Sequence, residues 1–350
     1  MPPPVRRRSH PVRSTRPPPC TDPQNLERYR APGWLPGGHL QTIWSAKLAR
    51  RYIGAPPRLW RERLTAPDGD FIDVDHLVRE AGAPPPRQHL VLFHGLEGSS
   101  ASAYALAFAS AARARGWACS LPNFRGCSGQ PNLAPRAYHS GDWPEVDWIL
   151  GKLRAQHVAP LVAAGVSLGG NVLLRWAEET GEAAAPVVRA LAAVCAPVDL
   201  TASGLAIDHG LNRIVYAHMF LATMKPKALI KLQQYPGLFD RERLLAAHTL
   251  AEFDDAFTAP LHGFRDAADY WRRASAKPHL RRIRIPALLA NARNDPFVPA
   301  RSLPSPADVS DRVTLWQPAA GGHVGFAQGR FPGSVLAMPD AVCDWLAAPC

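Results

Sequence analysis

Apolar runs of strand length recur along the chain, and most are followed by a stretch in which apolar residues repeat at helical spacing. This alternation predicts strand–helix–strand units, which build a mostly parallel sheet with helices on both faces, an α/β fold. The predicted strands of these units are His89–Phe93, Trp117–Pro122, Leu161–Val166, Val187–Ala196, Ala287–Asn291 and Val313–Trp316. The predicted helices cover roughly 103–115, a stretch that begins at Trp143, 171–180 and 335–347.

Two segments depart from this alternation. Leu59–Leu64 and Phe71–Val78 flank the turn sequence Pro67–Asp70, which predicts an antiparallel hairpin before the parallel units. Residues 200–282 offer only helical patterns and turns, so we expect a helical insertion that lies over the carboxyl ends of the strands as a cap. The domain that contains both segments is expected to span residues 32–350.

The first 31 residues differ from the rest in composition and charge. They are rich in proline and arginine and poor in apolar residues, so we expect a disordered arm. The formal net charge of the chain is +11, and residues 1–63 hold 13 Lys and Arg against 3 Asp and Glu. The remainder is close to neutral, and we expect no nucleic-acid partner. The arm is interpreted as a solvated tail, with salt-sensitive contact to anionic lipid or polyanions as the alternative; membrane contact is expected to be peripheral at most.

The sequence indicates neither a membrane span nor an oxidising compartment. No apolar run approaches the roughly 18–20 residues that cross a bilayer, and no apolar segment follows the N-terminal arginines as in a secretory signal. The six cysteines are scattered, without the spacing of a zinc site, so we interpret them as reduced. We therefore expect a cytoplasmic protein, and the sequence implies no metal site.

The candidate chemistry centres on Gly165-Val166-Ser167-Leu168-Gly169, a G-x-S-x-G sequence between a predicted strand and a predicted helix. In this context the motif is typical of a nucleophilic serine at the apex of a sharp turn. The two glycines leave room for the neighbouring strand and helix, where larger side chains would collide. A glycine-rich turn with an incidental serine is the alternative, so the interpretation depends on partners elsewhere in the chain.

Partners for Ser167 are found after two later strands. Asp295 follows the strand at 287–291, and His323 lies in a glycine-rich loop after the last strand. Because the carboxyl ends of parallel strands meet at one edge of a sheet, the three side chains can converge there. A serine nucleophile needs an imidazole to move its proton and a carboxylate to orient the imidazole. Asp199, which follows the strand after Ser167, is the alternative acid.

Backbone N–H groups of Leu96 and Leu168 are the candidates for stabilising an oxyanion. Leu96 lies in the loop after the strand at 89–93, and we interpret His94 as a brace for this loop rather than as a reacting group. Arg125 is also interpreted as a brace, with binding of an acidic substrate group as the alternative.

The remaining polar and aromatic candidates lie in and before the insertion. Asp254 and Asp255 are expected to cap helices or to pair with arginines. Asp142 and Glu145 predict a capping box at the start of the helix at Trp143. Several side chains of the insertion could line an acyl pocket, although ordinary packing explains them equally well; they are Tyr216, Met219, Phe220, Met224 and Tyr235.

Beyond these residues, the chain resembles the YheT-like branch of the α/β-hydrolases, which includes abhydrolase-domain lipid hydrolases of eukaryotes. The resemblance covers roughly residues 32–346 and rests on GHLQT (38–42), PDGDF (67–71), FHGLEGSS (93–100), FRGCSGQPN (124–132), YHSG (138–141), SLGGN (167–171), EFDD (252–255), NDPF (294–297) and GGHVGF (321–326). It implies an α/β-hydrolase fold with Ser167 as nucleophile, Asp295 as acid and His323 as base. It also implies hydrolysis of short- to medium-chain acyl esters without a cofactor, with glycerolipids among the substrates of some members. The sequence departs from the family pattern at 143–144, where polar and acidic residues are more usual.

The expected function is that of a serine carboxylesterase, which acts on a small-molecule or lipid ester through an acyl-enzyme. The same three residues could instead serve thioester or amide hydrolysis, or acyl transfer. A non-catalytic binding module of this fold is the third hypothesis, and the full set of candidate residues argues against it. The sequence leaves the acyl length, the alcohol group and the oligomeric state open.

Overall fold

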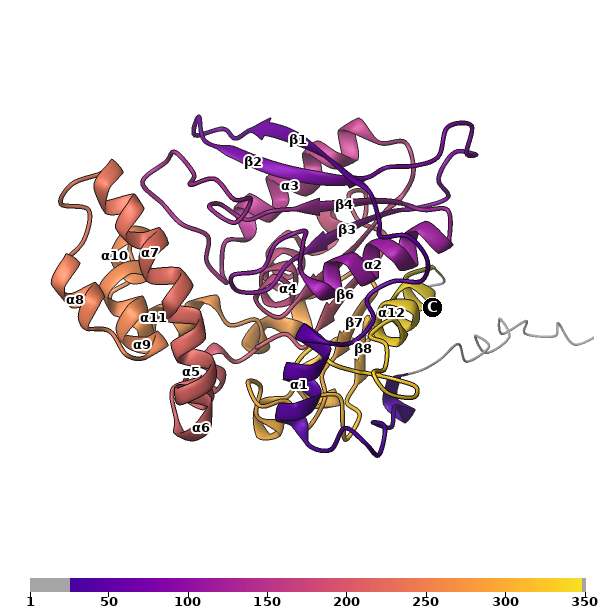
Figure 1. Cartoon of the computed structure of the whole chain (residues 1–350). Helices are drawn as coiled ribbons and strands as arrows, with labels where there is room; N and C mark the ends of the chain where they lie inside the picture. The colour runs from indigo at the N-terminus through magenta and orange to yellow at the C-terminus, as the bar shows by residue number, and fades with distance from the viewer. Residues whose placement is uncertain (1–25, 348–350) are drawn as a thin grey trace, which may run out of the picture.

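The computed structural model describes residues 26–347, and its centre is one sheet of eight strands (Figure 1). The strand order is β1-β2-β4-β3-β5-β6-β7-β8; β2 pairs antiparallel with β1 and β4, and all other neighbours pair parallel. The predicted hairpin, the parallel units and the α/β class are thus confirmed. The strands are β1 Leu59–Thr65, β2 Phe71–Leu77, β3 His89–Phe93, β4 Ala118–Pro122, β5 Leu161–Val166, β6 Leu191–Val194, β7 Ala287–Ala290 and β8 Val313–Trp316.

Helices cover both faces of the sheet. α2 (Ala103–Ala114) and α12 (Ala337–Ala347) pack together on one face. α3 (Trp143–Gln156) and α4 (Leu168–Thr180) pack together on the other face. The sheet is therefore the middle of three layers, with an apolar core on each side.

Side chains of one strand alternate between the two cores, as the pleat of a strand requires. In β3, Leu90 and Leu92 belong to the core beneath α2 and α12, while Val91 and Phe93 belong to the core beneath α3 and α4. Because both faces are covered, the strand is a continuous apolar run rather than an alternating one. Burial of each such side chain contributes about 1.5–3 kcal/mol, which makes the sheet a rigid support for the loops at its edge.

The insertion between β6 and β7 forms a helical cap beyond the carboxyl ends of the strands, with an apolar core of its own (Figure 1). It leaves and rejoins the sheet at one place: the Leu200 N–H donates to Ser275 Oγ at 2.9 Å, and the Lys277 N–H donates to the Val198 carbonyl at 2.8 Å. Its helices are α5 Leu200–Ile207, α6 Gly210–Asn212, α7 His218–Gln234, α8 Arg241–Ala246, α9 Leu250–Phe253, α10 Ala259–His262 and α11 Ala267–Ala274, with π-helical turns η3 at Arg213–Ala217 and η4 at Asp254–Thr258. Within residues 26–347, no helix combines the length and the apolar character needed to cross a membrane.

The chain before β1 packs against the domain from the first described residue. Leu26 and Tyr29 are buried in the core beneath α2 and α12, and the Tyr29 hydroxyl donates to the Ala327 carbonyl at 2.6 Å. The boundary that we expect at residue 31 is therefore too late, since residues 26–31 belong to the fold; residues 1–25 lie outside the described part of the chain. Short 3-10 helices occupy Leu26–Arg28, Gly181–Ala184, Lys277–Arg282, Ala300–Ser302 and Pro306–Asp308, and α1 spans Gly38–Lys47.

The start of α3 also differs from the prediction. Asp142 precedes the helix, but its side chain forms an ion pair with Arg136 and does not cap the backbone. Glu145 forms a buried ion pair with Arg125. The predicted capping box is wrong, because both carboxylates form ion pairs with arginines of the loop between β4 and α3.

We expect Tyr29→Ala to lower the free energy of unfolding by about 3–5 kcal/mol, as for other large buried aromatic side chains. The change removes the hydrogen bond to Ala327 and the edge-to-face contact with Phe326, whose ring centroid lies 5.4 Å away. Urea unfolding followed by circular dichroism measures the effect. The half-buried Tyr52 offers a matched control, for which Tyr52→Ala should cost much less. An unchanged unfolding midpoint for Tyr29→Ala would show that residues 26–31 do not contribute to the folded domain.

Candidate active site

Ser167 lies in the turn between β5 and α4, with a φ of 54° that non-glycine residues rarely adopt. The glycines on either side are required by close packing. A Cβ on Gly165 would lie 2.3 Å from the Gly169 carbonyl oxygen, and a Cβ on Gly169 would lie 2.5 Å from the carbonyl oxygens of Phe93 and His94. The G-x-S-x-G sequence therefore forms the sharp turn that raises the Ser167 hydroxyl above the edge of the sheet.

The structure brings His323 and Asp295 to Ser167. His323 Nε2 lies 3.0 Å from Ser167 Oγ, and His323 Nδ1 lies 2.8 Å from Asp295 Oδ2. The other carboxylate oxygen of Asp295 accepts hydrogen bonds from the N–H groups of Phe297 (2.7 Å) and Val298 (3.2 Å). With both oxygens engaged, the carboxylate is fixed in orientation and selects the imidazole tautomer that carries its proton on Nδ1. Nε2 is then free to accept the serine proton.

Asp199, the alternative acid, has a different role in the structure. It precedes α5, and its carboxylate accepts a hydrogen bond from the Ala202 N–H at 3.0 Å. This is the geometry of an N-cap, which satisfies one of the unpaired N–H groups at the start of a helix. The two aspartates therefore have different roles. Asp199 is the N-cap of α5, and Asp295 contacts His323.

Helix α1, to which the sequence interpretation assigns no role, holds the loop that carries His323. The Gln41 side-chain oxygen accepts hydrogen bonds from the Gly321 N–H (2.9 Å) and from Asn294 Nδ2 (3.0 Å). Thr42 Oγ1 accepts a hydrogen bond from the His323 N–H at 2.8 Å. The sequences GHLQT, NDPF and GGHVGF, which are far apart in the chain, are therefore neighbours around the imidazole.

Cys195 lies beneath the same loop and was not anticipated as part of the site. It follows β6 with a φ of 50°, and its Sγ accepts a hydrogen bond from the Val324 N–H at 3.2 Å. Burial raises the pKa of the thiol, which therefore stays protonated. Among residues 26–347, Cys195, Asp295 and His323 are the only three potential metal ligands whose donor atoms all lie within 4.8 Å of one another. Since Asp295 and His323 are hydrogen-bonded to each other beside a neutral thiol, their geometry fits proton transfer better than metal binding.

Leu96 and Leu168, the candidate oxyanion donors, both line the cavity in front of Ser167. Leu168 is the first residue of α4, so its N–H has no acceptor within the helix. Gly95 lets the loop of Leu96 approach closely, because a Cβ at this position would lie 3.0 Å from Ser167 Cβ. Two N–H groups from these neighbouring backbones can stabilise negative charge that develops beside the hydroxyl.

His94 and Arg125 have the geometry of braces. His94 Nδ1 lies 2.8 Å from the Gly95 carbonyl oxygen, and Nε2 accepts a hydrogen bond from the Phe124 N–H at 3.0 Å. Burial lowers the pKa of His94 to about 4, so the ring is neutral at pH 7. Arg125 is buried and ion-paired with three carboxylates, those of Asp68, Asp70 and Glu145. The polar atoms of both side chains therefore bind other parts of the protein and hold loops in place, as we expect for braces.

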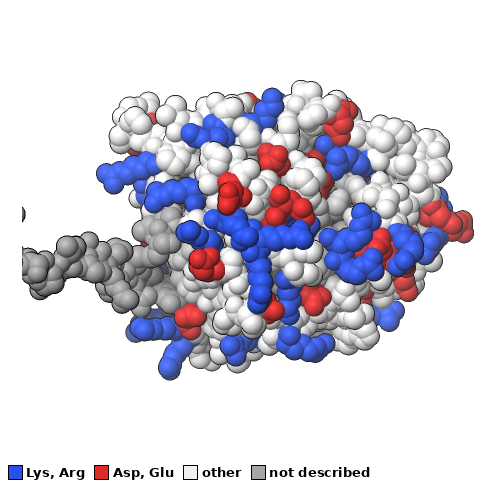
Figure 2. Space-filling model, turned by 180° about the vertical axis from the view of Figure 1, so that it is seen from behind, with Lys and Arg blue, Asp and Glu red and all other residues white. Residues whose placement is uncertain are grey.

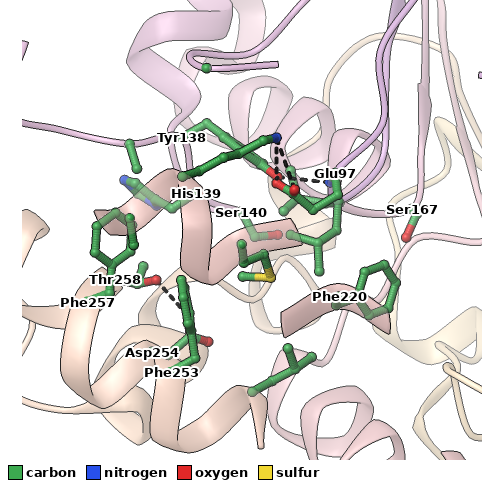
Figure 3. A pocket seen from close by; sticks show the side chains of 18 of the residues that line it. Glu97, Tyr138, His139, Ser140, Ser167, Phe220, Phe253, Asp254, Phe257 and Thr258 are labelled. Atoms are coloured by element: carbon green, nitrogen blue, oxygen red, sulfur yellow. Dashed lines mark hydrogen bonds and ion pairs between the residues drawn. The ribbon is translucent and has the colours of Figure 1, made fainter. Parts of the chain in front are cut away.

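A cavity of about 310 Å³ extends from Ser167 into the cap (Figure 3). Of the side chains considered for an acyl pocket, Phe220 and Met224 of α7 line this cavity, and the structure adds Ile207, Phe253 and Phe257 from other cap segments. The cavity lining does not include Tyr216, Met219 or Tyr235. Its apolar walls suit a hydrocarbon chain more than a charged group.

The mostly apolar cavity wall also carries ionisable side chains, and one of them, Asp254, lies far from Ser167 in Figure 3. Asp254 accepts hydrogen bonds from Thr258 Oγ1 (2.6 Å) and Trp271 Nε1 (2.8 Å) instead of the helix cap or arginine pair that we expect for it. Asp255 does cap a helix, since it accepts a hydrogen bond from the N–H of Ala267 at the start of α11. Burial raises the pKa of Asp254 to about 7 against the opposing effect of its two hydrogen bonds. The charge of the cavity wall therefore changes near neutral pH.

Comparison with known proteins agrees with the fold. Residues 88–329 match the family model described as "alpha/beta hydrolase fold". The match covers more than half of the chain, and the chain therefore belongs to the alpha/beta hydrolase family.

Within this family, the chain is similar to the protein named "Putative esterase YheT" of Escherichia coli, with 39% identity over 311 residues that cover 88% of this chain and 89% of the relative. It is also similar to the mouse protein named "Phospholipase ABHD3", with 28% identity over 304 residues that cover 83% and 74% of the two chains. The resemblance to the YheT-like branch is thus confirmed. Among solved structures, Est1E of Butyrivibrio proteoclasticus with bound ferulic acid matches with a TM-score of 0.51 and 15% identity over 82% of this chain and 98% of that chain, which shows the fold alone.

The two candidate acids can be separated by isosteric substitution. Asp295→Asn should reduce ester turnover by about 10⁴-fold, because an amide stabilises the wrong imidazole tautomer. Asp199→Asn should change turnover little, because asparagine is also a good N-cap. Steady-state hydrolysis of a p-nitrophenyl ester by both variants measures the difference, and near-wild-type turnover by Asp295→Asn would remove Asp295 from the site.

Proposed function

We propose that the protein is a serine esterase that hydrolyses carboxylic esters with Ser167, His323 and Asp295 as its catalytic triad. The observation that carries the proposal is the continuous pair of contacts, 3.0 Å and 2.8 Å, that joins the three side chains. Serine alone is a weak nucleophile, and this arrangement supplies both the base and the group that orients it. Membership of the alpha/beta hydrolase family and the similarity to a protein named as an esterase support the same reaction class.

In the proposed mechanism, Ser167 Oγ attacks the ester carbonyl while His323 Nε2 takes its proton. The N–H groups of Leu96 and Leu168 hold the oxyanion, and each such donor is typically worth about 2.7–4 kcal/mol of barrier. Collapse of the intermediate expels the alcohol, which receives the proton from His323, and leaves an acyl-enzyme. Water then attacks the acyl group with His323 as base, which releases the carboxylic acid and restores the serine. Asp295 stabilises the imidazolium in both halves of the reaction.

The proposed substrate is an ester with a short- to medium-length apolar acyl chain, including lipid esters such as acylglycerols. Support comes from the cavity, whose lining contains Ser167 together with the cap side chains Phe220 and Met224. Burial of each acyl CH₂ group against such walls contributes up to about 0.8 kcal/mol to binding. The enclosed cap therefore favours hydrocarbon chains over charged acyl groups.

The nucleophile is tested by labelling with a fluorophosphonate probe. Ser167→Ala should abolish labelling, because no other side chain is deprotonated by His323. Ser203→Ala is a matched control, since Ser203 is another buried serine of the same cavity wall, and it should label as the parent protein does. Equal labelling of the parent and Ser167→Ala, read on a fluorescent gel, would contradict the proposal.

The cavity also predicts a pH effect on acyl-chain binding. Because the pKa of Asp254 is about 7, its side chain is neutral below this pH and charged above it. A charged carboxylate disfavours a neighbouring hydrocarbon chain, so the KM for an octanoyl ester should rise several-fold relative to that for an acetyl ester between about pH 6 and about pH 8. Taking the ratio cancels the titration of groups that serve both substrates. Asp254→Asn should make the ratio independent of pH; a ratio that is already constant in the parent would place the acyl chain away from Asp254.

A further inference from the structure

Helix α1 has the reverse of the usual arrangement of polar and apolar side chains. Its buried residues are polar, namely Gln41, Thr42 and Ser45, and the first two hold the loop of His323. Its apolar residues Leu40 and Ile43 are exposed. A surface helix normally turns its apolar stripe toward the core, so the exposed stripe of α1 needs a separate explanation.

A second segment of the cap carries a similar apolar surface. In η3 and the first turn of α7, Ile214, Val215 and Met219 are exposed, and Ile214 retains 74% of its accessible surface. Farther along α7, Phe220 and Met224 line the cavity. One helical segment therefore presents apolar side chains both to the cavity and to the outside of the molecule.

The two segments meet beside the catalytic histidine. His39 of α1 stacks on Tyr216 of η3, with ring centroids 5.8 Å apart, and its Nδ1 lies 3.1 Å from the Tyr216 hydroxyl. Tyr216 packs edge-on against Phe297, which in turn contacts His323 with ring centroids 4.4 Å apart. Thr42 contacts the same histidine from the α1 side. We call the exposed side chains of these two segments the entry face; they are Leu40, Ile43, Lys47, Leu48, Leu211, Arg213, Ile214, Val215 and Met219.

The two segments that carry the entry face contain no acidic side chain of their own. The sequence contains no Asp or Glu from residue 28 to 61 or from residue 209 to 239, whereas Lys47, Arg50, Arg51, Arg213 and Lys225 lie in these ranges. On the side of the molecule that Figure 2 shows, acidic and basic side chains are intermixed. An apolar surface whose own charged side chains are basic is complementary to a bilayer surface, which has anionic head groups above an apolar interior.

We propose that the entry face binds the surface of an anionic phospholipid bilayer. Its apolar side chains would insert into the boundary between head groups and acyl chains, while Lys47 and Arg213 contact the negative head groups. A second copy of the chain is a poorer occupant, because a two-fold symmetric contact would bring these same basic side chains together. Binding of the bilayer by this face does not require ester hydrolysis.

The test is co-sedimentation of the full chain with vesicles, in a Ser167→Ala background so that the lipid stays intact. Vesicles of phosphatidylcholine alone and of phosphatidylcholine mixed with phosphatidylglycerol are compared at low and high salt. We expect binding to the anionic vesicles, weakened by salt, and reduced roughly tenfold or more by Ile43→Ser with Ile214→Ser and by Lys47→Glu with Arg213→Glu. Val158→Ser is the control; Val158 is 96% exposed but precedes β5, at the opposite edge of the sheet.

Turnover of a soluble ester by the same variants with Ser167 restored should be unchanged, which shows that they fold and separates this proposal from the catalytic one. Three results would each overturn the proposal. The parent protein could fail to bind anionic vesicles, or the entry-face variants could bind them as well as the parent does. Alternatively, size-exclusion chromatography could show that the parent is a dimer that the apolar variants dissociate, which would assign the face to a second copy.

Discussion

The positive φ of Ser167 is the constraint on which the rest of the site depends. A strained residue of this kind costs roughly 1–3 kcal/mol, and it persists only where its surroundings allow no other conformation. Here β5 before it and α4 after it are buried, so the turn cannot relax without moving both. Gly165 and Gly169 allow that packing by the close approach of backbone to backbone. The position of the Ser167 hydroxyl above the edge of the sheet is thus a consequence of how the core is packed.

The other half of the site depends on segments from opposite ends of the chain. Gln41 and Thr42 of α1, Asn294 after β7 and Cys195 after β6 all contact the loop that carries His323 or its neighbours. Each contact is an ordinary hydrogen bond, worth about 0.5–1.5 kcal/mol. Together they fix the position of the imidazole relative to Ser167. The geometry of the proposed triad is therefore a property of the whole domain and not of one motif.

The sheet and the cap could be predicted because their signals are local. A strand that is buried on both faces, such as β3 or β5, is a continuous apolar run, and the insertion shows no such run. The G-x-S-x-G turn is equally local. In contrast, Asp199 and Asp295 occupy equivalent positions after strands, and only the three-dimensional structure shows that one caps α5 while the other contacts His323.

Other features were mispredicted because distant contacts override the local pattern. Asp142 and Glu145 have the spacing of a capping box, but Arg136 and Arg125 bind them instead. Leu26 and Tyr29 are two buried side chains in a segment whose composition is that of a disordered tail. The polar face of α1 has the sequence pattern of a solvated helix face. Only the structure shows that this face is buried against the loop of His323.

The cap begins and ends at adjoining points, where Leu200 contacts Ser275 and Lys277 contacts Val198. Because β6 and β7 also pair directly with each other, the hydrogen bonding of the sheet does not depend on the segment inserted between them. Insertions, deletions or replacements within this segment can therefore be accommodated without disturbing the contacts among Ser167, His323 and Asp295. The lining of the cavity and the arrangement of the proposed triad are thus encoded in separable parts of one polypeptide.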